Sequence, residues 1–369
     1  MDNILVVGLY PTEACPTFTF QFCLSLKKQG YNVHAILPND IVNIQEWESN
    51  FNDENLIFLN ITKRKGILGK IDKFINPAKF IFNKPKLFKN ISKIKFSYIF
   101  FTFHHSWNSL LFGIKSNVKI MFVHDPIPHS DENKKKLLNQ RKQIKCMDKL
   151  IVLSKKFIDV TSKMYNFNKE NIYFMPHCLM NYSDHSCNYQ LNENLKIRFL
   201  FFGRLVKYKG LEYLIEAYEK LEKEDNNVEL VIAGNGSFDT YWQSFSMLKN
   251  KNLINRYIAE SEIEEIFCKP NTVCVLPYTD ATQSGVVSIA FEYKIPTIVS
   301  DTGGLKEQLN DGKIGIYCKP SDSESLYQCL KKCRDFSLLK EQSNLMDDYA
   351  KYLSWDNQVA ILMDRLIRK

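Results

Sequence analysis

The feature that most constrains the fold of this chain is a series of continuous apolar runs, several of them ending near glycine or proline and followed by helix-like segments. Because these runs do not alternate with polar residues, they are typical of strands buried on both faces of a parallel sheet. The pattern begins at the N-terminus and restarts after residue 196, which predicts two doubly wound α/β domains. The expected strands are residues 4–8, 31–37, 56–59, 98–103, 118–123 and 149–153 in the first half, and 197–202, 228–233, 255–258, 272–276, 297–300 and 315–318 in the second.

The length of the chain also favours two domains. Its 369 residues exceed what one hydrophobic core usually holds. The composition becomes polar over residues 176–195, which marks the expected boundary. We therefore expect a first Rossmann-like domain over residues 1–180, a second over residues 181–350, and a C-terminal helix over residues 351–369 that packs back toward the first domain.

The composition is that of a folded globular protein, with 45% hydrophobic and 24% charged residues. The apolar run at residues 4–8 follows no basic segment, is too short for a signal peptide and ends at Gly8, so we interpret it as a buried strand. No apolar stretch approaches the roughly 20 residues of a membrane-spanning helix. These features predict a cytoplasmic protein.

The ten cysteines are spread along the chain without a Cys-x-x-Cys pair. In a protein without a secretory signal, free buried thiols are the expected state. One cluster, formed by His177, Cys178, His185 and Cys187, lies within eleven residues but fits no zinc-binding pattern. The polar composition around it predicts a linker between the domains.

The net charge of +8 is concentrated in one segment. Residues 63–95 carry eleven basic residues against one acidic residue, Asp72, which leaves about −2 for the rest of the chain. Isoleucine, leucine and phenylalanine are interleaved with these cations, a composition suited to an anionic membrane surface. A solvated pair of helices on the first domain explains the segment equally well. Nucleic-acid binding is not expected, because the aromatic residues are all phenylalanine and no RNA-binding motif accompanies them.

Two basic side chains follow the expected strand at residues 197–202. The turn begins with Gly203-Arg204 and ends with Lys209-Gly210, where a helix is expected to begin. Ligands of open α/β sheets bind beyond the carboxyl ends of the strands, and helix N-termini bind phosphate. Arg204 and Lys209 are therefore placed to hold a diphosphate, the arginine as a fork and the lysine as a point charge. The alternative is a pair of solvated cations on a surface loop.

A second turn, residues 281–287 with the sequence Ala-Thr-Gln-Ser-Gly-Val-Val, opens a helix that carries Glu292. Its small and polar residues leave backbone N–H groups available to an anion, and the helix dipole adds to their attraction. Glu292 lies about two turns after Gly285, where a carboxylate suits the paired hydroxyls of a ribose. An ordinary exposed helix glutamate is the alternative. A third turn, residues 301–304, follows the next expected strand at the same rim of the sheet.

In order and spacing, residues 197–320 resemble the retaining family-4 glycosyltransferases, most closely the bacterial surface-polysaccharide branch whose donor turn has the sequence Thr-Gln-Ser-Gly-Val. The first half matches only in layout and in the turn His124-Asp125-Pro126. The resemblance implies the GT-B fold, with two facing Rossmann-like domains and the donor cleft between them. It is carried by Gly203-Arg204, Lys209-Gly210, residues 233–236 and 278–286, Glu292, Pro296 and residues 301–307.

The resemblance implies a nucleotide-diphosphate sugar, linked to uridine or guanosine, as the donor substrate. Arg204 and Lys209 would bind its diphosphate, and His124 would face the donor sugar and phosphate, which makes these three the candidate catalytic residues. The other candidate donor-binding residues are Gly203, the turn residues Gln283, Ser284, Gly285 and Val286, the ribose-binding Glu292, and Arg256, Tyr257 and Ile258 beside the nucleotide base.

Two positions depart from the family pattern. The first glutamate of the Glu-x7-Glu motif should stand at position 284, where this chain has serine, so recognition of the donor sugar is left open. The N-terminal glycine-rich turn is replaced by Ala14-Cys15-Pro16-Thr17, which leaves the approach of acceptor and phosphate open. In the family's retaining mechanism the leaving diphosphate takes the acceptor's proton on the same face. Catalysis then needs positioning and charge stabilisation rather than a protein nucleophile.

The chain has no Asp-x-Asp pair, so we expect no metal and no other cofactor. In the first domain, His105 and His129 are candidate acceptor-side residues. The predicted function is a retaining transfer of sugar to a saccharide or lipid-linked saccharide, in the assembly of a bacterial surface polysaccharide such as lipopolysaccharide. It would take place in the cytoplasm or on the inner face of the cell membrane.

Two alternatives remain open. One is a catalytically inactive glycosyltransferase-like scaffold, suggested by Ser284. The other is an NAD-dependent Rossmann oxidoreductase, which is disfavoured because no Gly-x-Gly-x-x-Gly follows the first strand of either domain.

Overall fold

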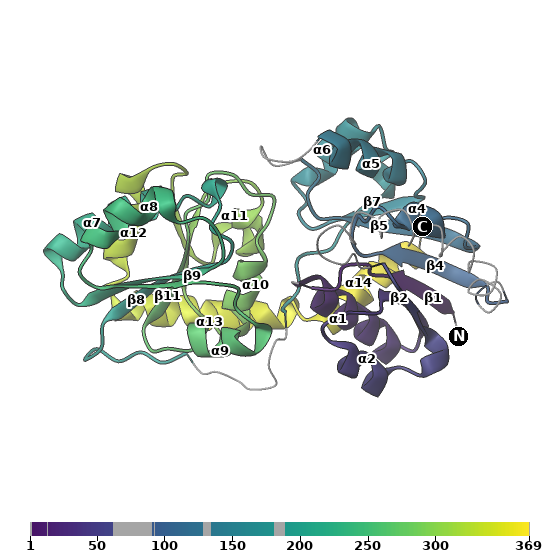
Figure 1. Ribbon diagram of the computed structural model, residues 1–369, viewed down its shortest axis with the longest axis horizontal. Coiled ribbons are helices and arrows are strands. Elements are labelled where there is room, and N and C mark those ends of the chain that lie inside the picture. The colour runs from purple at the N-terminus through teal and green to yellow at the C-terminus, as the bar shows by residue number, and fades with distance from the viewer. Residues whose placement is uncertain are drawn as a thin grey trace, which may run out of the picture. The chain divides into compact units, whose positions relative to one another are not determined.

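The computed structural model describes residues 2–12, 14–61, 91, 93–127, 134–180 and 189–368. The chain divides into two compact units, which we call unit 1 (Met1–Met175 with Trp355–Lys369) and unit 2 (Pro176–Ser354). Each unit is built on one parallel sheet with helices packed on it (Figure 1). The predicted fold class of two Rossmann-like α/β domains is confirmed.

Unit 1 holds a sheet of seven strands in the order β3-β2-β1-β4-β5-β6-β7, and neighbouring strands run parallel. The strands are β1 (Asn3–Val7), β2 (Asn32–Pro38), β3 (Leu56–Leu59), β4 (Phe96–Phe101), β5 (Ser116–Val123), β6 (Lys149–Val152) and β7 (Ile172–Phe174). The described helices are α1 (Ala14–Lys28), α2 (Ile44–Asn50), α4 (Asn108–Leu111), α5 (Lys134–Ile144), α6 (Phe157–Tyr165) and α14 (Trp355–Ile367), with short 3₁₀ helices η1 (Asp53–Asn55) and η2 (Lys169–Asn171).

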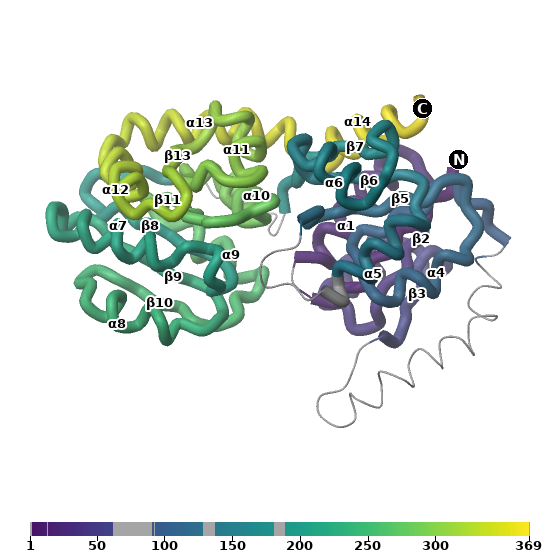
Figure 2. The backbone as a smooth tube through the Cα atoms, turned by 90° about the horizontal axis from the view of Figure 1, so that it is seen from above, coloured from purple at the N-terminus to yellow at the C-terminus, as the bar shows by residue number. Residues whose placement is uncertain are grey.

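The C-terminal helix α14 belongs to unit 1. It packs on α1, where the rings of Phe18 and Trp355 meet edge to face with centroids 4.9 Å apart. Figure 2 shows α14, in yellow, among the elements of this unit. The chain thus leaves unit 1 after Met175 and returns to it at Trp355, whereas we predicted boundaries at residues 180 and 350.

Unit 2 holds a sheet in the order β10-β9-β8-β11-β12-β13, again parallel. In Figure 1, α7, α8 and α12 lie on one face of this sheet, and α9 and α13 lie on the other. The strands are β8 (Ile197–Phe202), β9 (Val228–Gly234), β10 (Lys251–Asn255), β11 (Thr272–Leu276), β12 (Thr297–Ser300) and β13 (Ile316–Cys318). The helices are α7 (Leu211–Glu224), α8 (Asp239–Met247), α9 (Glu260–Phe267), α10 (Gly285–Glu292), α11 (Leu305–Gln308), α12 (Ser323–Lys332) and α13 (Phe336–Tyr352), with η3 (Lys207–Lys209) and η4 (Asn310–Gly312).

One strand lies earlier than predicted. We expected residues 255–258, but β10 occupies Lys251–Asn255. Because β10 is an edge strand, its residues are only partly buried and it lacks the apolar run of the central strands. Residues 256–258 therefore form the loop that follows β10.

Eight of the cysteines are free, and six of these are buried. Cys268 is disulfide-bonded, which corrects the prediction of a free thiol at that position. Pairing depends on how close two Cα atoms come in the fold, and the spacing of cysteines along the sequence does not reveal that distance.

Some predictions fall outside the described residues. They concern His129, His185, Cys187 and most of the basic segment at residues 63–95. Within the described ranges, none of the helices combines the length and the apolar character needed to cross a membrane.

Candidate functional site

The order of strands in unit 2 points to one place on its sheet. The chain runs outward from β8 to β10 and then returns to β11, which lies on the other side of β8. In open α/β sheets, ligands bind beyond the carboxyl ends of the strands at such a reversal. The loops that follow β8 and β11 therefore form the candidate site.

The loop after β8 is pressed against the loop after β11. Gly210 has φ +67°, and a Cβ there would lie 2.0 Å from the carbonyl oxygen of Pro277, so only glycine fits. Arg204 is exposed and forms no ion pair within the described part of the chain. The Lys209 side chain turns back toward the end of β8, where its Nζ lies 3.0 Å from the position of a Cβ on Gly203. The structure thus brings Arg204 and Lys209 to the same end of β8, as the sequence predicts.

Lys209 is buried, with 8% of its surface exposed. Its Nζ lies 2.7 Å from the hydroxyl oxygen of Tyr278 and 4.5 Å from the centroid of that ring. Burial, helped by the nearby charge of Arg204, lowers the pKa of Lys209 to about 7. Sequence reasoning missed Tyr278 as a partner of Lys209, because the two residues are far apart in the sequence and meet only through the packing of the two loops.

Helix α10 begins at the second turn. Ser284 is its N-cap and accepts a hydrogen bond from the backbone N–H of Val286 at 3.3 Å. The Ser284 hydroxyl also lies 3.2 Å from that of Tyr278. Gln308, from α11, holds the Ser284 backbone by accepting from its N–H at 2.8 Å and donating to its carbonyl at 3.2 Å. The turn is therefore rigidly placed, with the N-terminus of α10 beside Tyr278 and Lys209.

Gln283 offers an unused acceptor next to this turn. Its side-chain carbonyl oxygen is buried and has no hydrogen-bond partner among the described residues. Leaving a buried acceptor unpaired costs about 1–3 kcal/mol. A ligand hydroxyl donated to this oxygen would remove that cost.

Glu292 lies away from this turn. It is the last residue of α10, about 10 Å along the helix axis from Gly285. Gly285, Ser288 and Glu292 share one face of the helix, and this face meets His177. The Nδ1 of His177 lies 2.8 Å from the Ser288 hydroxyl, and its Nε2 is 3.8 Å from the position of a Cβ on Gly285.

His177 was assigned to a linker from the sequence, but it is a buried residue packed beneath α10. Burial lowers its pKa. The polar residues that follow it gave no sign of this packing. The ribose-binding role of Glu292 remains a prediction.

The loop after β10 holds the three candidates for the nucleotide base. Arg256 is engaged with Glu262 of α9 through two hydrogen bonds of 2.9 and 2.5 Å, which hold the pKa of Glu262 at about 2. Ile258 is buried, and Tyr257 is 58% exposed. The arginine therefore supports the start of α9, and Tyr257 is the one of the three that presents a large exposed ring. Their role toward the base remains a prediction.

The first-domain candidates lie at the carboxyl edge of the sheet of unit 1. His124 follows β5, stacks on Phe103 with centroids 4.2 Å apart, and has its Nε2 2.9 Å from the carbonyl oxygen of Thr102. His105, in the loop after β4, accepts from the backbone N–H of Trp107 and meets the ring of Tyr10 edge to face at 5.2 Å. Ala14–Thr17, which replace a glycine-rich turn, form the start of α1. The sheet thus gathers His105 and His124 at one edge, next to the strand reversal between β1 and β4.

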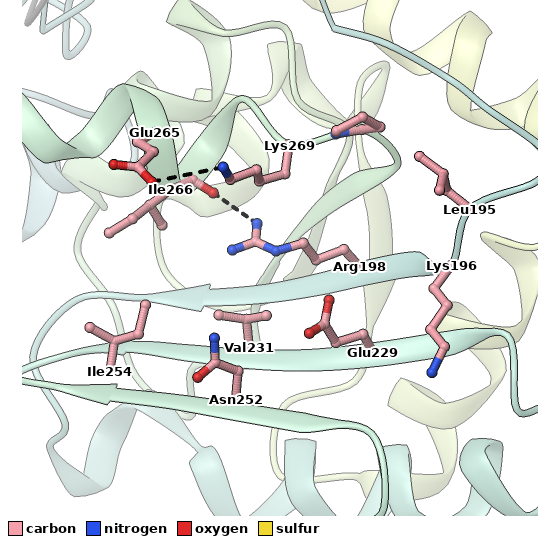
Figure 3. Close-up of a pocket in the computed structure, with 11 residues that line it drawn as sticks. Leu195, Lys196, Arg198, Glu229, Val231, Asn252, Ile254, Glu265, Ile266 and Lys269 are labelled. Carbon is pink, nitrogen blue, oxygen red and sulfur yellow. Dashed lines mark hydrogen bonds and ion pairs between the residues drawn. The ribbon is translucent and has the colours of Figure 1, made fainter.

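A cavity of about 530 Å³ lies at the opposite end of the sheet of unit 2 (Figure 3). It is lined by the amino-terminal parts of β8, β9 and β10 and by the end of α9. Arg198 donates from its Nη1 to the carbonyl oxygen of Ile266 at 2.8 Å and to the Thr272 hydroxyl at 3.2 Å, so it caps the end of α9. None of the predicted site residues lines this cavity, and it is separate from the candidate site.

Comparison with known proteins identifies the sequence family of unit 2. Residues 188–351 match the family model described as "Glycosyl transferases group 1". An uncharacterised glycosyltransferase of Methanocaldococcus jannaschii is 30% identical over 164 residues, which cover 43% of this chain and 41% of the relative. The alpha-D-kanosaminyltransferase of Streptomyces kanamyceticus is 24% identical over 146 residues, covering 39% and 38%. The chain thus spans less than half the length of these curated relatives.

Solved structures match the chain over its whole length. The sucrose-phosphate synthase of Thermosynechococcus elongatus aligns with a TM-score of 0.73 at 15% identity, covering 100% of this chain and 98% of the other. Anabaena HepE in complex with UDP and glucose aligns with a TM-score of 0.68 at 12% identity, covering 100% and 99%. At these identities the likeness establishes the fold, and it confirms the predicted pair of Rossmann-like GT-B domains.

Proposed function

We propose that this chain is a retaining glycosyltransferase that takes a sugar from a uridine- or guanosine-diphosphate donor. The observation that carries the proposal is the meeting of Arg204 and Lys209 with the N-terminus of α10 at the strand reversal of unit 2. The match of this unit to the group 1 glycosyltransferases and the HepE complex with UDP and glucose support a nucleotide-sugar donor.

The chemistry of the proposed step requires stabilisation of a departing diphosphate. Arg204 provides a planar fork of donors, Lys209 provides a compact cation, and the N–H groups at the start of α10 add the positive end of the helix dipole. These groups act most strongly as negative charge develops on the leaving oxygen. The Gln283 carbonyl is placed to accept a hydroxyl of the donor sugar.

On the proposed retaining route, the leaving diphosphate accepts the proton of the attacking hydroxyl on the same face of the sugar. Such a step needs no carboxylate nucleophile at the turn, and Ser284 stands where the resembled family has its first glutamate. We propose a saccharide or lipid-linked saccharide as the acceptor, with His105 and His124 on the acceptor side. Assembly of a surface polysaccharide, with residues 63–95 docking on an anionic membrane, completes the proposal.

The donor site can be tested by thermal unfolding with UDP or GDP in a buffer that contains a metal chelator. We expect stabilisation of about 2.7 kcal/mol when the nucleotide concentration is 100 times its dissociation constant. The Arg204→Ala variant should bind less tightly than the Lys207→Ala variant, which removes a neighbouring exposed cation from the same loop. A shift that appears only with added magnesium, or no shift with either nucleotide, contradicts the donor site.

A further inference from the structure

Lys209 lacks the partner that a buried ammonium usually has. Buried charges in proteins are normally paired with an opposite charge. The groups that act on Lys209 are Arg204 on its own loop, Cys274 of β11, and Tyr278 in the loop after β11. Ser284, the cap of α10, reaches Lys209 only through Tyr278. None of these groups is a carboxylate, and no ion pair involves Lys209 within the described residues.

We propose that Tyr278 is a positioning residue that holds Lys209 as a free amine in the empty site, so that Lys209 takes up a proton when the donor diphosphate binds. The inference rests on the proposed donor site and adds a proton to its binding reaction. It also assigns a consequence to Ser284, the position at which the chain departs from the family pattern.

The hydrogen bond between the two side chains suits both states of the lysine. Burial raises the pKa of Tyr278, so its hydroxyl stays protonated and donates to the free amine of Lys209 over the 2.7 Å contact. When a diphosphate enters, the amine takes a proton from solvent and becomes an ammonium. That ammonium donates to a phosphate oxygen and to the oxygen of Tyr278, which in turn directs its own proton to the Ser284 hydroxyl 3.2 Å away.

Ser284 decides whether this proton uptake occurs. A carboxylate at position 284 would sit beside Tyr278 and Lys209 and would favour the charged form of the lysine before any ligand arrives. With serine there, burial dominates and the pKa of Lys209 falls to about 7. Donor affinity should therefore be complete below pH 7 and decline as the pH rises above 7, because binding must then supply a missing proton.

The direct test is calorimetric titration with UDP and with GDP at pH 8, in two buffers of different ionisation enthalpy. The diphosphate is already ionised at this pH, so the buffer dependence of the heat reports protons taken up by the protein. A lysine with a pKa of about 7 predicts uptake of about 0.9 proton per nucleotide bound. The affinity should fall about fivefold from pH 7 to pH 8.

Three variants separate positioning from a structural role. Tyr278→Phe removes a partner that stabilises the ammonium more than the amine, so the alkaline fall in affinity should begin at lower pH. Tyr218→Phe is the matched control: it deletes a buried hydroxyl that donates to the Asn250 carbonyl at 2.7 Å and should leave the pH profile unchanged. Ser284→Asp keeps the helix cap and adds a charge, so uptake at pH 8 should fall toward zero.

The outcomes distinguish the two proposals. Tight binding of UDP or GDP without proton uptake overturns the role of Tyr278 and Lys209 and leaves the donor site standing. An alkaline fall that moves equally in the Tyr278→Phe and Tyr218→Phe variants also overturns it, because only stability would then be involved. Failure of both nucleotides to bind removes the donor site itself.

Discussion

Replacing Arg204 with alanine is expected to lower kcat on the order of 10²-fold or more, with a much smaller change in KM. The guanidinium meets the diphosphate in both the ground state and the transition state, but its attraction grows as charge develops on the leaving oxygen. The Lys209→Met variant, which keeps the length of the side chain, should lose turnover on the same scale. Steady-state kinetics with saturating donor measure both effects.

The matched control is Lys207→Ala. Lys207 is an exposed cation on the same loop, between Arg204 and Lys209, so its loss changes the local charge without removing a proposed diphosphate contact. It should keep turnover within about twofold of the wild type, as expected for a surface substitution. Full activity of Arg204→Ala and Lys209→Met would show that the diphosphate binds elsewhere.

The Gly303→Ala variant is expected to lose more than about 3 kcal/mol of stability together with donor binding. Gly303 has φ +54°, and a Cβ there would lie 1.4 Å from the carbonyl oxygen of Ala281, so the donor turn would have to move. The next residue, Gly304, also donates to the Thr282 carbonyl at 3.2 Å, which ties the loop after β12 to that turn. Urea unfolding and nucleotide titration measure the two losses.

Gly30→Ala serves as the control for backbone strain. Gly30 has φ +89°, but nothing lies within 4 Å of the position of a Cβ. This variant should cost about 1 kcal/mol through its conformation alone. Equal losses in the two variants would mean that the contact between Gly303 and Ala281 does not hold the donor turn.

Much of the candidate site could be predicted because its residues directly follow buried strands. Arg204 comes two residues after β8, and the turn that ends at Ser284 follows β11. The carboxyl ends of parallel strands share one edge of a sheet, so the sequence order alone brings these residues together. His105 and His124 were placed at the edge of the first sheet by the same reasoning.

The contacts that tune the site could not be predicted in this way. Tyr278 meets Lys209 because Gly210 lets one loop press on the other, and nothing in the spacing of these residues reveals that approach. His177 lies in a polar stretch, yet the fold buries it under α10. The edge strand β10 was misplaced because solvent, rather than a second layer, covers part of it. In each case the deciding factor is tertiary packing.

The most direct test of the account is sugar transfer by the wild-type protein. The protein is incubated with a panel of UDP- and GDP-sugars and saccharide acceptors, without added metal, and proton NMR follows the anomeric signals of donor and product. The account predicts release of the nucleoside diphosphate and a product linkage with the anomeric configuration of the donor. A product with inverted configuration would contradict the proposed mechanism, and absence of transfer across the whole panel would favour an inactive scaffold.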